Sequence, residues 1–223
     1  MSGKRGLFIS FEGLDGSGKS TQIARLAETL TARSLDVLAT REPGGSAIGK
    51  RIRSILLDSR TAGLSPRAEL ALMFADRAQH IEEHIAPALK AEKIVICDRY
   101  TDSTEAYQGF GRQLGAQVVL DLHRMLCQDL WPDLTLLLES ELGASVARAR
   151  NRNQSSRSSE GRFESEDAAF FRRVHEGFEK IALRETNRIV RIPAGTIQNV
   201  EAQILGIVDS RFPQLTNRAA VTR

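Results

Sequence analysis

The sequence predicts an α/β fold in which a five-stranded parallel sheet lies between two layers of helices. Two observations support this fold class. Short aliphatic or β-branched runs recur along the chain, and each is followed by a segment of helical character, so the connections must cross over the sheet. The chain has 223 residues, of which 41% are hydrophobic and 5% aromatic, which suffices for one domain with an aliphatic core. Ligands in such folds bind at the carboxyl ends of the strands.

Five runs have the length and composition of strands. Each is short, apolar or β-branched, and bounded by polar or turn-forming residues. We expect strands at residues 7–11, 37–40, 94–98, 134–138 and 189–192. The run Ile94-Val-Ile-Cys-Asp98 is typical of a buried strand, and it ends in a carboxylate.

Helical segments follow these strands. We expect helices at about 19–33 and at 47–57, where isoleucines recur at helical spacing. Ser65-Pro66 is typical of an N-cap followed by proline in the first turn, and a helix should continue from there to about residue 87. A final helix over 200–208 has an apolar stripe.

Composition and charge exclude several classes of protein. No apolar run approaches the length of a membrane span, and the N-terminal stretch is apolar for only a few residues before Glu12, so we expect neither a membrane protein nor a signal peptide. A net charge of +3 argues against a nucleic-acid binder. Cys97 and Cys127 form no C-x-x-C pair, which indicates structural thiols in a reducing compartment. These features predict a cytoplasmic protein.

A phosphate-binding motif follows the first expected strand. The segment Gly13-Leu-Asp-Gly-Ser-Gly-Lys-Ser20 satisfies G-x-x-x-x-G-K-[ST] between a strand and a helix. Its glycines let backbone amides turn toward phosphate oxygens, the helix N-terminus adds partial positive charge, and Lys19 adds a full one. The motif predicts a fold of the P-loop NTPase type that binds a nucleoside triphosphate. It does not choose among kinase, GTPase and motor, but the chain has no Asn-Lys-x-Asp sequence for guanine recognition.

Four stretches, in this order, resemble signatures of the thymidylate kinase family, and the resemblance extends over nearly the whole chain. They are the phosphate loop Glu12-Gly-Leu-Asp-Gly-Ser-Gly-Lys-Ser-Thr21, the segment Thr40-Arg-Glu-Pro-Gly-Gly45, the motif Asp98-Arg-Tyr100, and the segment Thr101-Asp-Ser-Thr-Glu-Ala-Tyr-Gln-Gly-Phe-Gly-Arg112. The second and fourth are far more specific than the phosphate loop alone. The resemblance implies transfer of the γ-phosphate of ATP to dTMP, giving dTDP and ADP for dTTP synthesis.

The resemblance also implies which residues bind ATP and Mg²⁺. For ATP these are Gly13, Leu14, Asp15, Gly16, Ser17, Gly18, Lys19, Ser20 and Thr21, with Arg148 as a residue that stacks on adenine. Ser20 and Asp98 are the expected metal ligands, because a hydroxyl and a carboxylate at strand ends suit Mg²⁺.

The acceptor site implied by the resemblance lies on three segments. Arg53 and Arg99 contact the acceptor phosphate, and Glu42 lies close to the substrate. Arg77 donates to the thymine carbonyl, Thr104 and Gln108 lie at the base edge, Tyr107 crowds the 2′ position of the sugar, and Asp15 contacts the 3′ hydroxyl. The family commonly stacks a phenylalanine on thymine four residues before the arginine. Here that position is Met73, while Phe74 lies three before; either could cover the base, and we favour Phe74 slightly.

A cluster of arginines lies on a polar segment after the fourth strand. Arg148, Arg150, Arg152, Arg157 and Arg162 occur with one acidic residue, Glu160, among them. We expect a lid at about residues 148–163, since phosphoryl transfer needs cations around the transferred group and the exclusion of water. Position 16 in the phosphate loop is glycine, so the resemblance is to the bacterial type, in which the lid supplies the catalytic arginine. The expected catalytic residues are Lys19, Arg99, Arg152 and Arg162.

Residues 1–212 should form this single kinase domain, followed by a disordered tail at 213–223. The resemblance also implies a homodimer, in which two copies pack through helices.

Two other functions stay open: another small P-loop kinase that acts on a deoxynucleoside or a different monophosphate, and an ATP-binding sensor without turnover. His80-Ile-Glu-Glu-His84 matches the H-x-x-E-H zinc pattern, but it lacks an evident third ligand.

Overall fold

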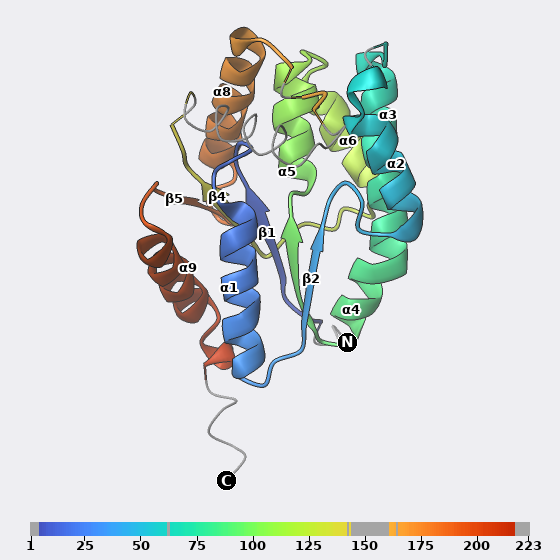
Figure 1. Ribbon diagram of the computed structural model, residues 1–223. Coiled ribbons are helices and arrows are strands. Elements are labelled where there is room, and N and C mark those ends of the chain that lie inside the picture. The colour runs from blue at the N-terminus through green and yellow to red at the C-terminus, as the bar shows by residue number, and fades with distance from the viewer. Residues whose placement is uncertain (1–4, 62, 142, 144–160, 164, 217–223) are drawn as a thin grey trace.

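The computed structural model of the protein describes residues 5–61, 63–141, 143, 161–163 and 165–216. One parallel sheet with the strand order β2-β3-β1-β4-β5 forms its centre (Figure 1). The strands are β1 (Phe8–Glu12), β2 (Val37–Arg41), β3 (Ile94–Asp98), β4 (Leu134–Leu138) and β5 (Ile189–Ile192). The predicted fold class is confirmed, and each strand lies within one residue of its expected range. The strand order, which puts β1 between β3 and β4, was not predicted.

Helices cover both faces of the sheet (Figure 1). They are α1 (Lys19–Ala32), α2 (Ala47–Leu57), α3 (Pro66–His80), α4 (Ala86–Lys90), α5 (Thr101–Thr104), α6 (Ala116–Leu126), α8 (Ala168–Arg184) and α9 (Ile197–Arg211). Two π-helical turns, η2 (Ile81–Ile85) and η3 (Glu105–Gly111), continue α3 and α5, and two 3₁₀ turns are η1 (Ser59–Thr61) and η4 (Pro213–Leu215). The expected N-cap is present, since the Ser65 hydroxyl accepts a hydrogen bond from the Ala68 amide at 3.3 Å.

Alternation along the strands divides the core into layers. In β3, Ile94 and Ile96 pack in the cluster formed with α1 and α9, whereas Val95 and Cys97 pack in the cluster formed with α3 and α4. Successive side chains of a strand point to opposite faces, so one five-residue strand contributes to both layers. A third cluster joins α8 to η3 and to Leu137 of β4. The segments that follow β1, β2 and β3 therefore emerge from a sheet that is packed on both sides.

The end of the chain differs from the expected disordered tail over the part that is described. Pro213–Leu215 form the turn η4, and Leu215 is buried in the cluster that holds α9 against the sheet. Residues 217–223 lie outside the described residues, and so do Arg148, Arg150, Arg152 and Arg157 of the expected lid.

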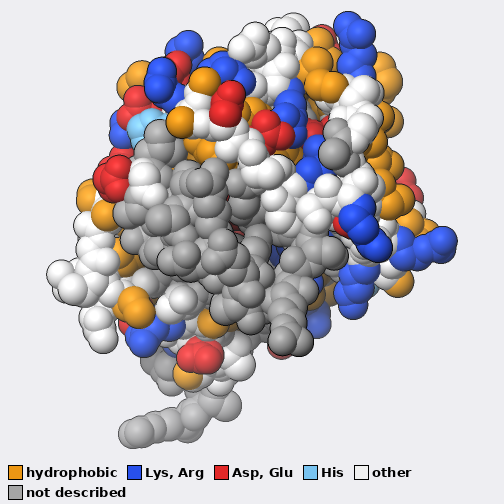
Figure 2. Space-filling view, turned by 45° about the horizontal axis from the view of Figure 1, so that its top comes forward, with side chains coloured by type: hydrophobic (Ala, Val, Ile, Leu, Met, Phe, Trp, Pro, Cys, Tyr) orange, Lys and Arg blue, Asp and Glu red, His pale blue; other side chains and the backbone are white. Residues whose placement is uncertain are grey.

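Basic, acidic and hydrophobic side chains are interspersed on the face nearest the carboxyl ends of the strands (Figure 2). Among the described residues, no helix has the length and apolar character needed to span a bilayer.

Removal of a core side chain should destabilise the domain strongly. Leu136 of β4 is fully buried, so Leu136→Ala should lower the free energy of unfolding by about 2–5 kcal/mol, through lost burial and a residual cavity. The matched control is Leu183→Ala on α8, where the leucine is 72% exposed and the change should stay within about 0.5 kcal/mol. Urea unfolding of both variants measures the difference. Equal effects would contradict the layer assignment.

Candidate active site

The sheet brings two loops together at its carboxyl edge. β1 leads into the phosphate loop and β3 leads into Asp98-Arg99, and because the strands are adjacent and parallel, Phe11 lies beside Asp98 in the register. In Figure 1 these strand ends point upward, toward the part of the molecule where α3, α5 and α8 project beyond the sheet. A cavity of about 650 Å³ lies between these segments.

Most of the residues predicted from sequence line this one cavity. They are Asp15, Gly16, Gly18, Lys19, Ser20, Thr21, Glu42, Arg53, Met73, Arg77, Asp98, Arg99, Thr104, Tyr107 and Gln108. These residues come from the phosphate loop and α1, the segment after β2, the helices α2 and α3, and the segment after β3. The cavity thus joins a phosphate cradle to the segments expected to hold an acceptor.

The phosphate loop has the backbone that its glycines permit. Gly13 has φ of +129°, and a Cβ there would lie 2.4 Å from the carbonyl oxygen of Leu138, so no other residue fits without a shift. The Lys19 ammonium donates to the carbonyl oxygens of Gly13 at 3.0 Å and Leu14 at 2.9 Å. Burial, reinforced by the nearby Arg99 guanidinium, lowers the pKa of Lys19 to about 8. An anion in the cradle would oppose this shift and keep the lysine charged.

Ser20 and Asp98 form a hydroxyl–carboxylate pair beside the cradle. The Ser20 hydroxyl donates to Asp98 Oδ2 at 3.1 Å, and Asp98 Oδ1 is buried with no hydrogen-bond partner among the described residues. A buried carboxylate oxygen needs a cation or a donor to offset its desolvation. Hard oxygen ligands of this kind suit Mg²⁺, so the residues present fit the predicted metal.

Arg99 is held in a constrained turn. It has φ of +70°, a conformation that costs a non-glycine residue about 1–2 kcal/mol. Its guanidinium donates to Asp15 at 2.8 Å and to the Ser103 hydroxyl at 2.8 Å, and it lies 5.2 Å from the ring centroid of Tyr107. The Tyr107 hydroxyl donates in turn to Asp15 at 3.3 Å. Asp15 and Tyr107, which are expected at the sugar, therefore lie in contact with Arg99, which is expected at the acceptor phosphate.

Glu12 supports this turn, and sequence reasoning assigned it no role. One of its carboxylate oxygens accepts the Tyr100 amide at 2.8 Å, and the other accepts the Ser103 hydroxyl. Burial, reinforced by the Asp102 carboxylate, raises the pKa of Glu12 to about 7. The sequence feature that could have identified Glu12 is its position, since it is a carboxylate at the end of an apolar strand, directly before the phosphate loop.

The far end of the cavity is built around Arg77. Its Nε donates to Glu42 at 2.7 Å and its Nη2 to the Thr104 hydroxyl at 2.9 Å. The guanidinium lies 5.1 Å from the ring centroid of Phe74 and 5.0 Å from that of Tyr100. Burial opposes the charge, but Glu42 raises the pKa of Arg77 above its ordinary value. Nη1 is buried without a hydrogen-bond partner in the described part of the chain, so it can donate to a ligand.

The structure favours Met73 over Phe74 as the side chain that meets a ligand. Phe74 is fully buried in the core and packs against Arg77, whereas Met73 lines the cavity. The spacing could not separate the two, because both positions share the helical face of Arg77. Gln108 also lines the cavity, but its amide donates to the buried Glu69 at 2.7 Å.

Arg53 and the loop after β2 form the wall between the two ends. Arg53 Nη1 donates to the carbonyl oxygen of Pro43 at 3.0 Å, and the Gly44 amide donates to Asp76 at 2.9 Å. Burial, together with the nearby Glu42, raises the pKa of Asp76 to about 6. The loop is thereby fixed to both α2 and α3.

Arg162 is not brought to the phosphate cradle in this structure. Its Nη1 lies 2.7 Å from Glu69, and its Nε donates to the carbonyl oxygen of Leu56 at 2.5 Å. It is 7% exposed and does not line the cavity, although its neighbour Phe163 does. In this conformation the predicted catalytic arginine ties its segment to the end of α2 and to α3.

A second cavity, of about 380 Å³, lies on the other side of the phosphate loop. Ser17 and Gln22 line it together with Pro193-Ala194, the segment after β5. The Gln22 amide donates to the carbonyl oxygen of Ile197 at 3.0 Å, while its Oε1 is buried without a partner among the residues described. This cavity thus lies beside the phosphate loop, at the carboxyl ends of β4 and β5.

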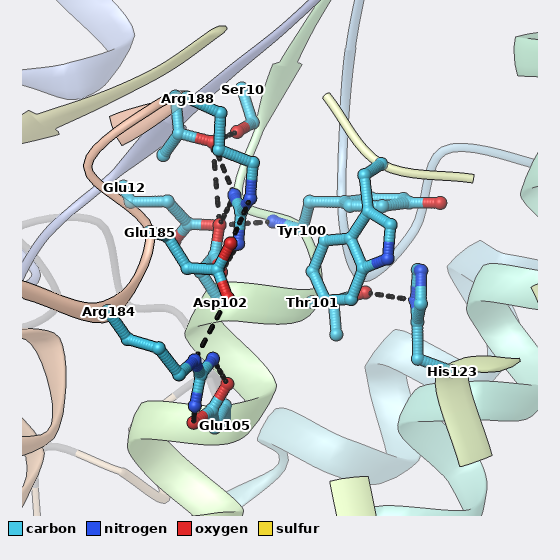
Figure 3. Close-up of polar contacts among 12 residues, drawn as sticks. Ser10, Glu12, Tyr100, Thr101, Asp102, Glu105, His123, Arg184, Glu185 and Arg188 are labelled. Carbon is cyan, nitrogen blue, oxygen red and sulfur yellow. Dashed lines mark hydrogen bonds and ion pairs between the residues drawn. The ribbon is translucent and has the colours of Figure 1, made fainter. Parts of the chain in front are cut away.

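Two ion pairs with buried carboxylates anchor the segment that carries Ser103, Thr104 and Tyr107. Asp102 accepts two hydrogen bonds of 2.7 Å from Arg188, and Glu105 accepts two of 2.7 Å from Arg184 (Figure 3). Both carboxylates are essentially unexposed. Bidentate pairs of this kind fix orientation as well as distance. They hold the acceptor segment to the end of α8 and to the turn before β5.

Comparison with known proteins settles the family. A family model described as thymidylate kinase matches residues 11–204. The chain belongs to the thymidylate kinase family. The thymidylate kinase of Desulfovibrio desulfuricans is 50% identical over 190 residues, covering 84% of this chain and 88% of that protein. The thymidylate kinase of Solidesulfovibrio magneticus is 45% identical over 205 residues, covering 91% and 98%. A crystal structure of the thymidylate kinase of Ehrlichia chaffeensis matches with a TM-score of 0.73 and 32% identity, covering 92% of this chain and 98% of that one.

The buried Glu12 should give this thymidylate kinase family member a distinct dependence of stability on pH. Its pKa is 4.5 ordinarily and about 7 in the fold, so the folded state holds this proton more tightly, and the contribution to stability falls as pH rises from about 4.5 to about 7. Glutamine at position 12 cannot lose a proton. The unfolding free energy of Glu12→Gln minus that of the wild type should therefore increase across this pH window and stay constant above it. Urea unfolding at several pH values measures this difference.

The exposed Glu28→Gln on α1 is the matched control and should follow the wild type. A Glu12→Gln variant that differs from the wild type by the same amount at every pH would contradict the raised pKa.

Proposed function

We propose that this protein transfers the γ-phosphate of ATP to dTMP, giving dTDP and ADP for dTTP synthesis. The observation that carries the proposal is that Lys19 and Arg99 face one cavity, whose far end holds Arg77 Nη1, an atom with no hydrogen-bond partner among the described residues. A single cavity thus holds three features in succession. These are a cradle for the phosphates of ATP, a cation for the acceptor phosphate and a hydrogen-bond donor for a base carbonyl. Membership of the thymidylate kinase family supports the same activity.

The acceptor should lie between the turn after β3 and helix α3. Arg99 and Arg53 would hold its phosphate, and Asp15 and Tyr107 would contact the sugar, with the tyrosine ring opposing a 2′ hydroxyl. Arg77 would donate to a carbonyl of thymine while Met73 covers the ring. Each of these side chains lines the cavity or is hydrogen-bonded to one that does.

Mg²⁺ is the proposed metal, held by Ser20 and Asp98. When bound it would neutralise charge on the donor phosphates. The buried Asp98 Oδ1, which has no hydrogen-bond partner in the described part of the chain, supports this assignment.

Catalysis by the chain itself is mainly positioning. The acceptor phosphate oxygen is ionised at neutral pH, so little general-base help is needed, and in-line attack depends on how Arg99, Arg53 and Lys19 hold the two phosphates. Arg148 on adenine and Arg152 at the transferred group remain the proposed lid contacts, and both lie outside the described residues. Arg162 would first have to leave Glu69 to act there.

A homodimer in the cytoplasm is the proposed state of the protein. Exposed apolar side chains on two helices that each pack on α3 support it: Ile48 and Ile55 on α2, and Val118, Met125 and Leu126 on α6. Hydrophobic side chains are visible along the right-hand edge of Figure 2, on the side where Figure 1 places α2 and α3. Burial of such a patch between two copies would remove it from water.

The activity is tested by incubating the protein with ATP, Mg²⁺ and separately dTMP, dUMP, dCMP, dGMP, AMP or thymidine, and measuring ADP and the new nucleotide. We expect clear preference for dTMP. Lys19→Ala should lower kcat about 10²–10³-fold by removing a cation from the transferring phosphate, and Arg99→Ala should raise KM for dTMP about 10- to 100-fold.

Lys90→Ala, at an exposed position at the end of α4, is the matched control and should leave both constants unchanged. Preference for thymidine or another monophosphate would retain a P-loop kinase but reject the base site, and tight ATP binding without turnover would indicate a sensor.

The metal assignment predicts a shifted Mg²⁺ requirement. Asp98→Asn keeps the shape of the side chain and removes its charge, so the Mg²⁺ concentration for half-maximal rate should rise about tenfold or more. Chelation of divalent cations should stop turnover in the wild type, and added Mg²⁺ should restore it. Asp36→Asn, at an exposed site just before β2, is the control. An unchanged requirement in Asp98→Asn would remove Asp98 from the metal site.

A further inference from the structure

His80 lies fully buried at the end of α3, and its two ring nitrogens are hydrogen-bonded to Thr40 in β2 and to Glu42 just after that strand. Nδ1 is 2.9 Å from Glu42 Oε1, and Nε2 is 2.7 Å from the Thr40 hydroxyl. This histidine begins the H-x-x-E-H pattern, which the proposed function leaves without a role. Its partner in the pattern, His84, is partly exposed and lies 3.6 Å from Glu83 instead.

The ring of His80 has little room to move. A Cβ added at Gly45 would lie 2.3 Å from His80 Nε2 and 2.5 Å from two ring carbons. Glycine at position 45 therefore lets the backbone of the loop close over the imidazole. A ring held on one side by backbone and at both nitrogens by hydrogen bonds has a single orientation.

Glu42 joins His80 to Arg77. Its Oε1 faces His80 Nδ1, and its Oε2 accepts Arg77 Nε at 2.7 Å. A neutral imidazole with its proton on Nδ1 satisfies both ring nitrogens, because Nδ1 then donates to the Glu42 carboxylate while Nε2 accepts from the Thr40 hydroxyl. A carboxylate held at both oxygens cannot rotate, so the plane of the Arg77 guanidinium is fixed as well.

We propose that His80 is a positioning residue for the acceptor base: its Nδ1 holds Glu42, and Glu42 holds Arg77 with Nη1 directed at a pyrimidine carbonyl. This inference rests on the proposed function, since it requires Arg77 to bind the acceptor. The hydrogen-bonded chain Thr40–His80–Glu42–Arg77 ends at the buried Nη1, which has no partner among the described residues. A donor left unpaired in this way is set for a ligand.

A metal ion is the other occupant that these donors could suggest. One ligand atom each from Glu42, His80 and Cys97 lie within 4.8 Å of one another. Both nitrogens of His80 are already in hydrogen bonds, and the Cys97 thiol donates to the Arg99 carbonyl at 3.1 Å. Arg77 is paired with Glu42, so its positive charge would repel a metal cation bound there. The geometry therefore favours positioning over coordination.

Two substitutions separate the roles of the two nitrogens. In His80→Asn, the amide nitrogen can occupy the position of Nδ1 and donate to Glu42. In His80→Gln, the amide nitrogen occupies the position of Nε2 beside Thr40, and Glu42 loses its donor. His80→Gln should therefore raise KM for dTMP about tenfold while KM for ATP and kcat stay within about twofold, because a buried carboxylate oxygen loses its donor. His80→Asn should restore KM for dTMP to within about threefold of the wild type.

The experiment measures steady-state kinetics of the intact protein with ATP, Mg²⁺ and dTMP or dCMP, for the wild type and both variants. The preference for dTMP over dCMP should fall in His80→Gln and recover in His80→Asn. His84→Gln is the matched control, since its side chain is 40% exposed. If His80→Gln does not fold, Thr40→Val, which keeps the ring and removes only the hydroxyl, should raise KM for dTMP by a smaller factor with KM for ATP unchanged.

The outcomes distinguish this inference from the proposed function. A wild type that prefers dTMP, with variants that change only thermal stability or alter both KM values equally, would overturn the positioning role alone. Stimulation of the wild type by Zn²⁺, lost equally in both variants, would overturn it in favour of a metal site. A wild type that rejects dTMP would overturn both proposals.

Discussion

The buried carboxylate of Glu12 is the constraint on which the active site depends. It stands at the end of β1 and accepts hydrogen bonds from the Ser103 hydroxyl on α5 and from the Tyr100 amide, in the turn that follows the adjacent strand β3. Arg99 adopts its costly left-handed conformation within that turn. One side chain thus fixes the acceptor arginine relative to the phosphate loop that begins at Gly13. Its burial raises its own pKa, so the same placement that orders the site costs stability above neutral pH.

Helix α3 provides the second fixed part of the cavity. Arg77 and His80 contact Glu42, while Asp76 accepts a hydrogen bond from the Gly44 amide, so α3 holds the loop after β2 together with α2. Bidentate arginine–carboxylate pairs hold the opposite wall, at α5 and η3. Both walls are therefore rigid before a ligand arrives, and binding energy can go into orientation rather than into ordering side chains.

Sequence predicted the strands and the phosphate loop well because their signals are local. An apolar run such as residues 94–98 and a glycine-rich loop such as 13–20 carry their structure in adjacent residues. What the sequence could not decide depends on contacts between residues far apart along the chain. Helical spacing could not separate Met73 from Phe74, since the choice is made by packing of Phe74 against Arg77. Arg162 was expected at the phosphates, but the buried Glu69, distant in sequence, holds it elsewhere.

The most direct test of the account is a crystal structure of the protein with dTMP and a non-hydrolysable ATP analogue. The account predicts that the analogue's phosphates lie against Lys19, that the dTMP phosphate lies within hydrogen-bond distance of Arg99, and that Arg77 Nη1 donates to a carbonyl of thymine. The acceptor would then occupy the cavity of about 650 Å³. A dTMP molecule bound elsewhere, or one whose base points away from Arg77, would contradict it.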